Sequence, residues 1–150
     1  MKLKVLVGSG GRIMSLTLPF LVVGVVANIL WPGLFALGFG RGGLIAGIVL
    51  LAVGVPIWFT GVGQVVVNVP RRRLITTGPF AVLLHPMYTS VALLVFPGLG
   101  LLFDSWVGAA IGAALYVSAR IYSPGEEEML RKYFPSEYPA YRKRVLIPWL

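Results

Sequence analysis

The side chains able to take part in acid–base chemistry gather in the second half of the chain. The single histidine, His85, all five acidic residues and all six tyrosines lie between Arg71 and Leu150. Cysteine is absent, which excludes disulfides, thiolate metal sites and a cysteine nucleophile. One histidine and five acids leave few ways to hold a metal ion, so we expect no metal site.

His85 stands directly before a proline, in the segment Leu84-His85-Pro86-Met87-Tyr88. A residue before proline avoids the α region, and proline suits the first helical position, so we expect His85 at the N-cap of a helix. Free backbone N–H groups at such a start favour a carboxylate or a phosphate. Tyr88, three residues on, lies on the same face. From these residues alone, a simple cap or a headgroup contact explains His85 equally well.

Three consecutive glutamates, Glu126 to Glu128, follow Ser123-Pro124-Gly125. Serine at the N-cap, proline at N1 and glutamate at N3 form a capping box, so we expect a new short helix to begin here. Acids in a first turn also complement the helix dipole, which is a purely structural explanation of the run.

This short helix is expected to be amphipathic and to end before Pro135. Its apolar stripe comprises Met129, Leu130, Tyr133 and Phe134, while Arg131 and Lys132 face away. A second short helix is expected to hold Tyr138, Tyr141 and Val145, with Arg142-Lys143-Arg144 meeting lipid headgroups.

The composition places these elements on a membrane protein. Hydrophobic residues make up 57% of the 150 residues and charged residues only 12%, with a mean hydropathy of +0.87. A soluble domain carries about 25% charged residues, and disorder needs low hydrophobicity, so both classes are excluded. Long uncharged runs cover residues 13–40, 42–70 and 74–103, and a fourth covers 105–119.

A spanning helix needs about 20 mostly apolar residues. We therefore predict an all-α, polytopic membrane helix bundle, forming a single domain over residues 1–150. About four transmembrane helices are expected near residues 13–31, 44–67, 86–103 and 105–122, followed by the short C-terminal amphipathic helices. Pro97-Gly98 should kink the third span, and only Asp104 separates the third from the fourth, which predicts a tight hairpin. Small residues on the fourth span let helices approach closely in lipid.

Basic residues set the expected orientation. With the N-terminus in the cytoplasm, twelve of the thirteen Lys and Arg residues fall on the cytoplasmic side, and Arg41 is the exception. Both termini and the segments 71–88 and 123–150 then face the cytoplasm. Topology and lipid contact thus explain the net charge of +8, and we expect no nucleic-acid partner. Arg71-Arg72-Arg73 is interpreted first as a cluster facing anionic headgroups.

Two patches resemble the isoprenylcysteine carboxyl methyltransferase and phospholipid methyltransferase group, from Thr76 onward. The family's first motif, T-x-G-P-[YF] followed by R-H-P-x-Y-x-G, is matched at Thr76, Gly78-Pro79-Phe80, His85-Pro86 and Tyr88. Its second, E-E-x-x-L-x-x-x-F-G-x-x-Y-x-x-Y with V-P-R and a proline after it, is matched at Glu126-Glu127, Leu130, Phe134, Tyr138, Tyr141, Val145 and Pro148. The chain departs from these motifs at Leu84, Ser90, Pro135 and Leu146-Ile147.

The resemblance implies an integral membrane methyltransferase that uses S-adenosylmethionine on a lipid or isoprenoid-type acceptor at the cytoplasmic face. It implies a cofactor site comprising Gly78, Pro79, Phe80, Leu84, His85, Pro86, Tyr88, Glu126 and Glu127. His85 would serve the cofactor's carboxylate, and the glutamates its ammonium and ribose hydroxyls. Glu127, as proton acceptor for an amine, and Tyr141, as an aromatic face for the sulfonium, are the expected catalytic residues.

Two alternatives stay open at this point. One is a non-enzymatic membrane scaffold or lipid-binding protein with the same fold, because arginines of the family motif are missing. The other is a membrane reductase using NADPH, whose 2′-phosphate would suit Arg71-Arg72-Arg73. The oligomeric state is open.

Overall fold

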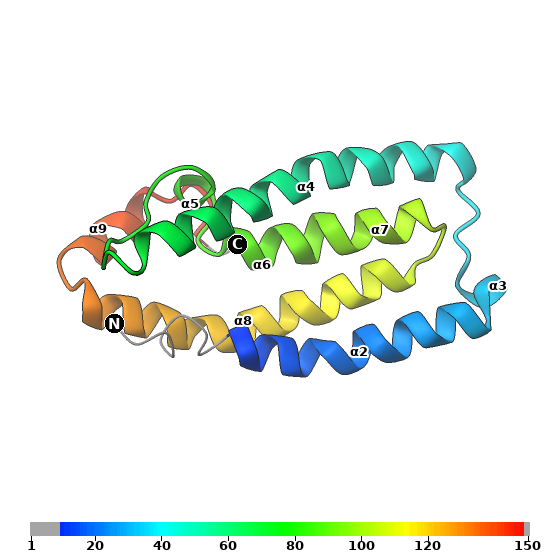
Figure 1. Ribbon diagram of the computed structural model, residues 1–150, viewed down its shortest axis with the longest axis horizontal. Helices are drawn as coiled ribbons and strands as arrows, with labels where there is room; N and C mark the ends of the chain where they lie inside the picture. The colour runs from blue at the N-terminus through cyan, green and yellow to red at the C-terminus, as the bar shows by residue number, and fades with distance from the viewer. Residues whose placement is uncertain (1–9, 149–150) are drawn as a thin grey trace.

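The computed structural model describes residues 10–148, and the regular structure of these residues is helical (Figure 1). The elements in chain order are α2 (Gly10–Leu30), α3 (Pro32–Phe35), α4 (Gly40–Asn68), α5 (Pro79–Val82), α6 (Pro86–Ser90), η1 (Val91–Val95), α7 (Phe96–Leu102), α8 (Val107–Tyr133) and α9 (Glu137–Arg144). Because α6, η1 and α7 follow one another without a break, they form one continuous rod.

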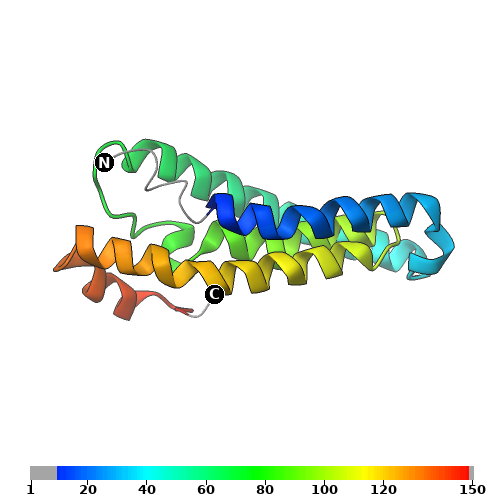
Figure 2. The ribbon, with the colours of Figure 1, turned by 90° about the horizontal axis from the view of Figure 1, so that it is seen from below.

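The long helices lie side by side and alternate in direction along the chain (Figures 1 and 2). The α6–η1–α7 rod packs against both α4 and α8, and α2 packs against α8. Figure 1 shows α5 and α9 at one end of the bundle and α3 at the other. The prediction of an all-α helix bundle is thereby confirmed.

Two of the helices, α2 and α4, are long and apolar enough to cross a membrane. They cover the spans expected at 13–31 and 44–67. Large apolar side chains point outward from both helices, such as Val23 and Phe59, which are 67% and 63% exposed. Exposing apolar surface to water costs a free energy of about 25 cal/mol per Å², and contact with lipid avoids this cost. The rods at 86–102 and 107–133 match the expected positions of the other two spans, and their crossing of the membrane stays a prediction.

Glycines let the rods approach one another closely. The buried residues of α4 are all glycines, at positions 43, 47, 54 and 61. On α8, Gly108 faces Gly100 of α7, and a Cβ on Gly112 would collide with the carbonyl oxygen of Ala92. Such contacts supply the van der Waals packing that joins helices in lipid. The expected role of small residues on the fourth span is confirmed at Gly108 and Gly112.

The predicted hairpin between the third and fourth spans is present, and Asp104 fastens it to the chain that follows α3. Asp104 has a positive φ of 53°, its Oδ1 accepts a hydrogen bond from the Phe39 N–H at 3.2 Å, and its carbonyl accepts one from the Leu37 N–H at 3.1 Å. The ends of α2, α4, α7 and α8 are thus held together opposite the α9 end.

The irregularity in the third rod lies before Pro97 rather than at Pro97-Gly98. Residues 91–95 form the π-helical turn η1, and the Phe96 N–H donates to the carbonyl of Val91. Proline has no N–H for the carbonyl four residues earlier, and its ring crowds that carbonyl. A widened turn just before the proline relieves this conflict.

The expected helix start at Ser123 and Pro124 is wrong, because α8 runs through both residues to Tyr133. A proline inside a helix removes one hydrogen bond, which costs about 3 kcal/mol when nothing compensates. Here Ser123 is buried, and the helix beyond it makes the long-range contacts described below, so tertiary packing overrides the local capping signal. The three glutamates therefore lie on the same continuous helix as residues 107–122, where the fourth span is expected.

Replacing Gly112 with alanine is expected to destabilise the bundle by about 1–3 kcal/mol, because the new methyl group meets the Ala92 backbone. Gly125→Ala is the matched control on the same helix, since a Cβ there meets nothing within 4 Å. Thermal unfolding in detergent checks the pair. Equal unfolding midpoints for the two variants would contradict the packing described for α8.

Candidate functional site

His85 occupies the predicted N-cap position, with Pro86 opening α6. Its side chain makes no capping hydrogen bond. The imidazole instead points across to α8 and is only 15% exposed. The predicted backbone position is confirmed, and the ring is directed at other side chains rather than at the helix start.

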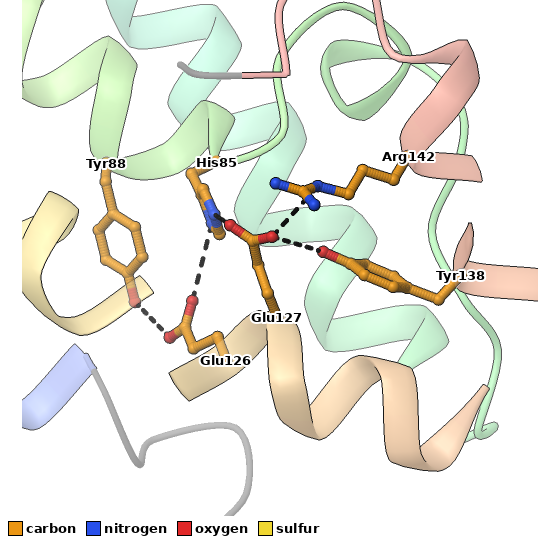
Figure 3. A network of polar contacts seen from close by, with 6 residues as sticks. All are labelled: His85, Tyr88, Glu126, Glu127, Tyr138 and Arg142. Carbon is orange, nitrogen blue, oxygen red and sulfur yellow. Dashed lines mark hydrogen bonds and ion pairs between the residues drawn. The ribbon is translucent and has the colours of Figure 1, made fainter. Parts of the chain in front are cut away.

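Two neighbouring carboxylates of α8 meet the two nitrogens of this ring (Figure 3). Nδ1 of His85 lies 3.8 Å from Oε2 of Glu126, and Nε2 lies 3.5 Å from Oε1 of Glu127. Nε2 is buried but makes no hydrogen bond within residues 10–148. The Tyr88 hydroxyl donates to Oε1 of Glu126 at 3.0 Å. The two motif patches predicted from the sequence thus come into direct contact.

His85, Tyr88, Glu126 and Glu127 form a polar cluster, and helix α9 contributes two further side chains to it. Nε of Arg142 lies 3.3 Å from Oε2 of Glu127, and the Tyr138 hydroxyl donates to the same oxygen at 3.3 Å. The sequence analysis assigned Arg142 to lipid headgroups, and the structure corrects this. Arg142 and Tyr138 are one helical turn apart on α9, so their side chains lie on the same face of the helix. This spacing could have predicted from the sequence that the two side chains act at one site.

The α9 helix is held in place by its C-terminal extension. The Leu146 N–H donates to the carbonyl of Ala81 at 3.3 Å, and the Ile147 N–H to that of Val82 at 2.9 Å. The Tyr141 hydroxyl donates to the carbonyl of Phe80 at 2.8 Å. These bonds join α9 to the α5 segment that carries His85.

Glu126 and Glu127 both lie beyond the expected end of the fourth span, and their pKa values are shifted in opposite directions. Burial raises the pKa of Glu126, although His85 and the Tyr88 hydrogen bond oppose the rise. The contact with His85, supported by Arg142 and Tyr138, lowers the pKa of Glu127. Burial raises the pKa of Tyr141 to about 12, so its hydroxyl stays protonated at neutral pH.

A largely apolar pocket opens beside the cluster, between the end of α4, the α5–α6 segment, the end of α8 and α9. Of the residues expected at the cofactor site, those lining it are Phe80, Leu84, His85, Pro86, Tyr88 and Glu126. Tyr141, expected as a catalytic residue, lines it as well. The predicted apolar stripe also lines it, through Met129, Leu130, Tyr133 and Phe134.

Three expected site residues do not line this pocket. Gly78 has a φ of +61° and turns the chain beside the Gln64 side chain, and Pro79 then opens α5. Both shape the segment that presents His85. Glu127 lies on the cluster's other side, between His85 and Arg142.

Two arginines of the predicted headgroup cluster, Arg72 and Arg73, line the pocket as well, whereas Arg71 does not. The turn after α4 closes with hydrogen bonds from the Arg72 N–H to Val69 and from the Arg73 N–H to Asn68. Arg72 takes the left-handed position of this turn, with a φ of 54°, where glycine is usual. A left-handed L-residue costs about 1–2 kcal/mol.

A family model described as phospholipid methyltransferase matches residues 39–137, about two thirds of the chain. The matched segment runs from the start of α4 to the start of α9 and includes His85, Glu126 and Glu127. The chain belongs to this family, and its two long apolar helices, α2 and α4, agree with the membrane location that the family suggests. No curated protein and no solved structure matches it.

Stability is expected to depend on pH through Glu127. Its folded pKa lies below that of an unfolded glutamate, about 4.3, so the ionised group stabilises the fold above that value. This stabilising contribution of the ionised Glu127 is lost as the pH falls through the pKa of Glu127 in the folded protein. Glu127→Gln should therefore lower the free energy of unfolding by about 1–2 kcal/mol at pH 7 and progressively less below pH ~4.

Glu128→Gln is the control for that measurement, because Glu128 is exposed and pairs with Lys132, at 2.7 Å along the helix surface. Exposed pairs contribute little, so its unfolding midpoint should stay close to that of the parent protein. A loss in Glu127→Gln that stays the same size from pH 7 to well below pH ~4 would show that the carboxylate charge is not involved.

Proposed function

We propose that this member of the phospholipid methyltransferase family transfers a methyl group from S-adenosylmethionine to a lipid or isoprenoid-type acceptor. The observation that carries the proposal is the meeting of one imidazole with two carboxylates beside an apolar pocket at the end of the bundle. Water-soluble and lipid-soluble molecules can both reach such a place.

The donors and acceptors of the cluster suit the amino-acid end of this cofactor. Nε2 of His85 is buried and lies 3.5 Å from Oε1 of Glu127 without forming a hydrogen bond within residues 10–148, so this nitrogen can still bond to a ligand group. His85 and Arg142 can donate to a carboxylate, and Glu126 and Glu127 can accept from an ammonium or from hydroxyls. We assign these residues to cofactor binding, together with Phe80, Leu84, Pro86 and Tyr88, and the turn at Gly78 and Pro79 to positioning.

When bound, S-adenosylmethionine would supply a methyl group on a sulfonium for transfer to the acceptor, with the neutral thioether as the leaving group. The protein's part is to align the two molecules and to exclude water, which supplies much of the rate in such a reaction. Tyr141 lines the pocket with its hydroxyl held by Phe80, so its ring face is fixed for contact with a cation. Apolar side chains of α8, among them Met129 and Leu130, line the pocket and favour the exclusion of water from it.

The fate of the acceptor's proton depends on the acceptor. A carboxylate needs no base, whereas an amine must lose a proton as the new carbon–nitrogen bond forms. Glu126 is the better base of the pair, because burial raises its pKa, while the lowered pKa of Glu127 suits it to holding a cation. We therefore propose Glu126 as the proton acceptor and keep Glu127 for binding.

We place the site at the cytoplasmic face, with four spans and both termini on that side. Arg12, at the start of α2, and the basic residues after α4 and on α9 lie at the helix ends near the pocket, and Arg41 begins α4 at the far end. This distribution fits a bundle with its positive end inside. Lys2 and Lys4, which also entered the predicted orientation, lie outside the described residues.

His85→Ala is expected to weaken the binding of S-adenosylhomocysteine by at least about tenfold, or about 1.4 kcal/mol. The fold should survive, because His85 makes no capping hydrogen bond. Calorimetric titration of the detergent-purified protein measures the affinity, with NADPH as the comparison ligand. Unchanged affinity in a folded variant would contradict the role of His85, and binding of NADPH instead would favour a reductase.

Glu127→Gln and Glu128→Gln form a matched pair for the same titration. Glu127 faces His85 and Arg142, whereas Glu128 points to the exposed Lys132. We expect Glu127→Gln to lose at least about tenfold in affinity and Glu128→Gln to change it by less than about twofold. Equal losses would mean that the glutamates act only through their position in the helix.

A further inference from the structure

The polar cluster contains one side chain to which the proposed function gives no role, Tyr138 of α9. It is only 1% exposed, and its ring packs in an apolar cluster with Leu84, Tyr141 and Val145. Its hydroxyl leaves these apolar neighbours and donates to Oε2 of Glu127 at 3.3 Å (Figure 3). A buried tyrosine of this kind combines a fixed apolar ring with one directed hydrogen-bond donor.

Glu127 needs such a donor because its side chain is long and flexible. Its two carboxylate oxygens face different partners. Oε1 lies 3.5 Å from Nε2 of His85, whereas Oε2 accepts the Tyr138 hydroxyl and lies 3.3 Å from Nε of Arg142. The Arg142 side chain is itself long and is 46% exposed, while Tyr138 is locked by packing. Tyr138 is therefore the more rigid of the two α9 groups that direct the carboxylate.

The neighbouring tyrosine of α9 shows that the helix is docked by other bonds. The Tyr141 hydroxyl donates to the backbone carbonyl of Phe80 at 2.8 Å, and the N–H groups of Leu146 and Ile147 donate to the α5 segment as well. These bonds join backbone to α9 and its extension, whereas the Tyr138 hydroxyl bonds to a side chain of the site. Without the Tyr138 hydroxyl, α9 would keep these docking bonds, and Glu127 would lose one of its two holders.

The surroundings of Tyr138 keep its hydroxyl a donor. Burial raises the pKa of Tyr138 well above its usual range, and the charge of the Glu127 carboxylate raises it further. The hydroxyl therefore stays protonated wherever Glu127 is ionised. A hydrogen bond to an ionised acceptor is stronger than one between neutral groups. After the larger effect of His85, this bond contributes to the lowered pKa of Glu127.

We infer that Tyr138 is a positioning residue, which holds one oxygen of Glu127 toward α9 and leaves the other facing His85 before a ligand binds. The ordered carboxylate can then accept from the ammonium or a hydroxyl of S-adenosylmethionine without first losing side-chain freedom. This inference rests on the proposed function, because Glu127 is one of the cofactor-binding residues proposed above. The ring of Tyr138 also lines the pocket, so the hydroxyl has to be tested apart from the ring.

The single histidine of the chain offers a readout that needs no ligand. Isotope-labelled histidine gives ring signals from His85 alone in the NMR spectrum of the full chain in detergent. Tyr138→Phe removes only the hydroxyl, and we expect it to shift these signals, because Oε1 of Glu127 is no longer held beside Nε2. In a Glu127→Ala background, adding Tyr138→Phe should leave the His85 signals where Glu127→Ala alone puts them.

Tyr141→Phe is the matched control, because it also removes one tyrosine hydroxyl from α9, but one that donates to a backbone carbonyl. Both variants should lower the unfolding midpoint by a similar amount, about 2–4 °C, and only Tyr138→Phe should shift the His85 signals. Equal shifts in the two variants would mean that α9 as a whole has loosened. Unchanged signals in Tyr138→Phe would mean that its hydroxyl does not orient Glu127. Either result overturns the inference.

Calorimetric titration with S-adenosylhomocysteine tests the consequence for binding. Tyr138→Phe should weaken the affinity about three- to tenfold relative to the parent protein. Unchanged affinity would overturn the role of Tyr138 in cofactor binding, even where the His85 signals move. The proposed function fails separately, if the parent protein does not bind S-adenosylhomocysteine, and the His85 signals then still decide whether Tyr138 orients Glu127.

Discussion

The contact of His85 with Glu126 and Glu127 is the interaction on which the functional end of this protein depends. Each carboxylate faces a different ring nitrogen, so the α5–α6 segment and α8 have to meet in one register. Burial then raises the pKa of one carboxyl, and the His85 contact lowers that of the other. Neighbouring residues of the same type thereby acquire different chemistry, which is how an acid–base assignment arises from environment.

The bundle supplies the precision that this contact needs. Buried glycines let α4 and α8 approach the central rod closely, and the hairpin at Asp104 fixes the far end. Because α8 continues through Pro124, the glutamates belong to the long packed helix rather than to a separate short helix. Backbone bonds from Leu146 and Ile147 then hold α9 and Arg142 against the cluster. A site on rigid elements keeps its geometry better than one on loops.

Much of the fold could be predicted from local sequence. The long uncharged runs predicted the positions of α2 and α4, and the proline after His85 predicted the N-cap. The spacing of apolar residues predicted the apolar stripe of α8. The sequence analysis failed where distant contacts outweigh local signals. Ser123-Pro124 forms a good start signal but lies within a packed helix, and the π-helical turn before Pro97 reflects the fit of a whole rod. The pairing of Arg142 with Glu127 depends on bonds between residues 146–147 and 81–82, which no local spacing reveals.

The most direct test of the account is an experimental structure of the protein with S-adenosylhomocysteine bound. The account predicts the ligand in the pocket beside α8, with its amino-acid end within hydrogen-bond distance of His85 and of Glu126 or Glu127. It also predicts that the sulfur faces the ring of Tyr141. Ligand bound instead in the more polar hollow between residues 74–81 and α9, with the cluster around His85 unchanged, would contradict the central claim.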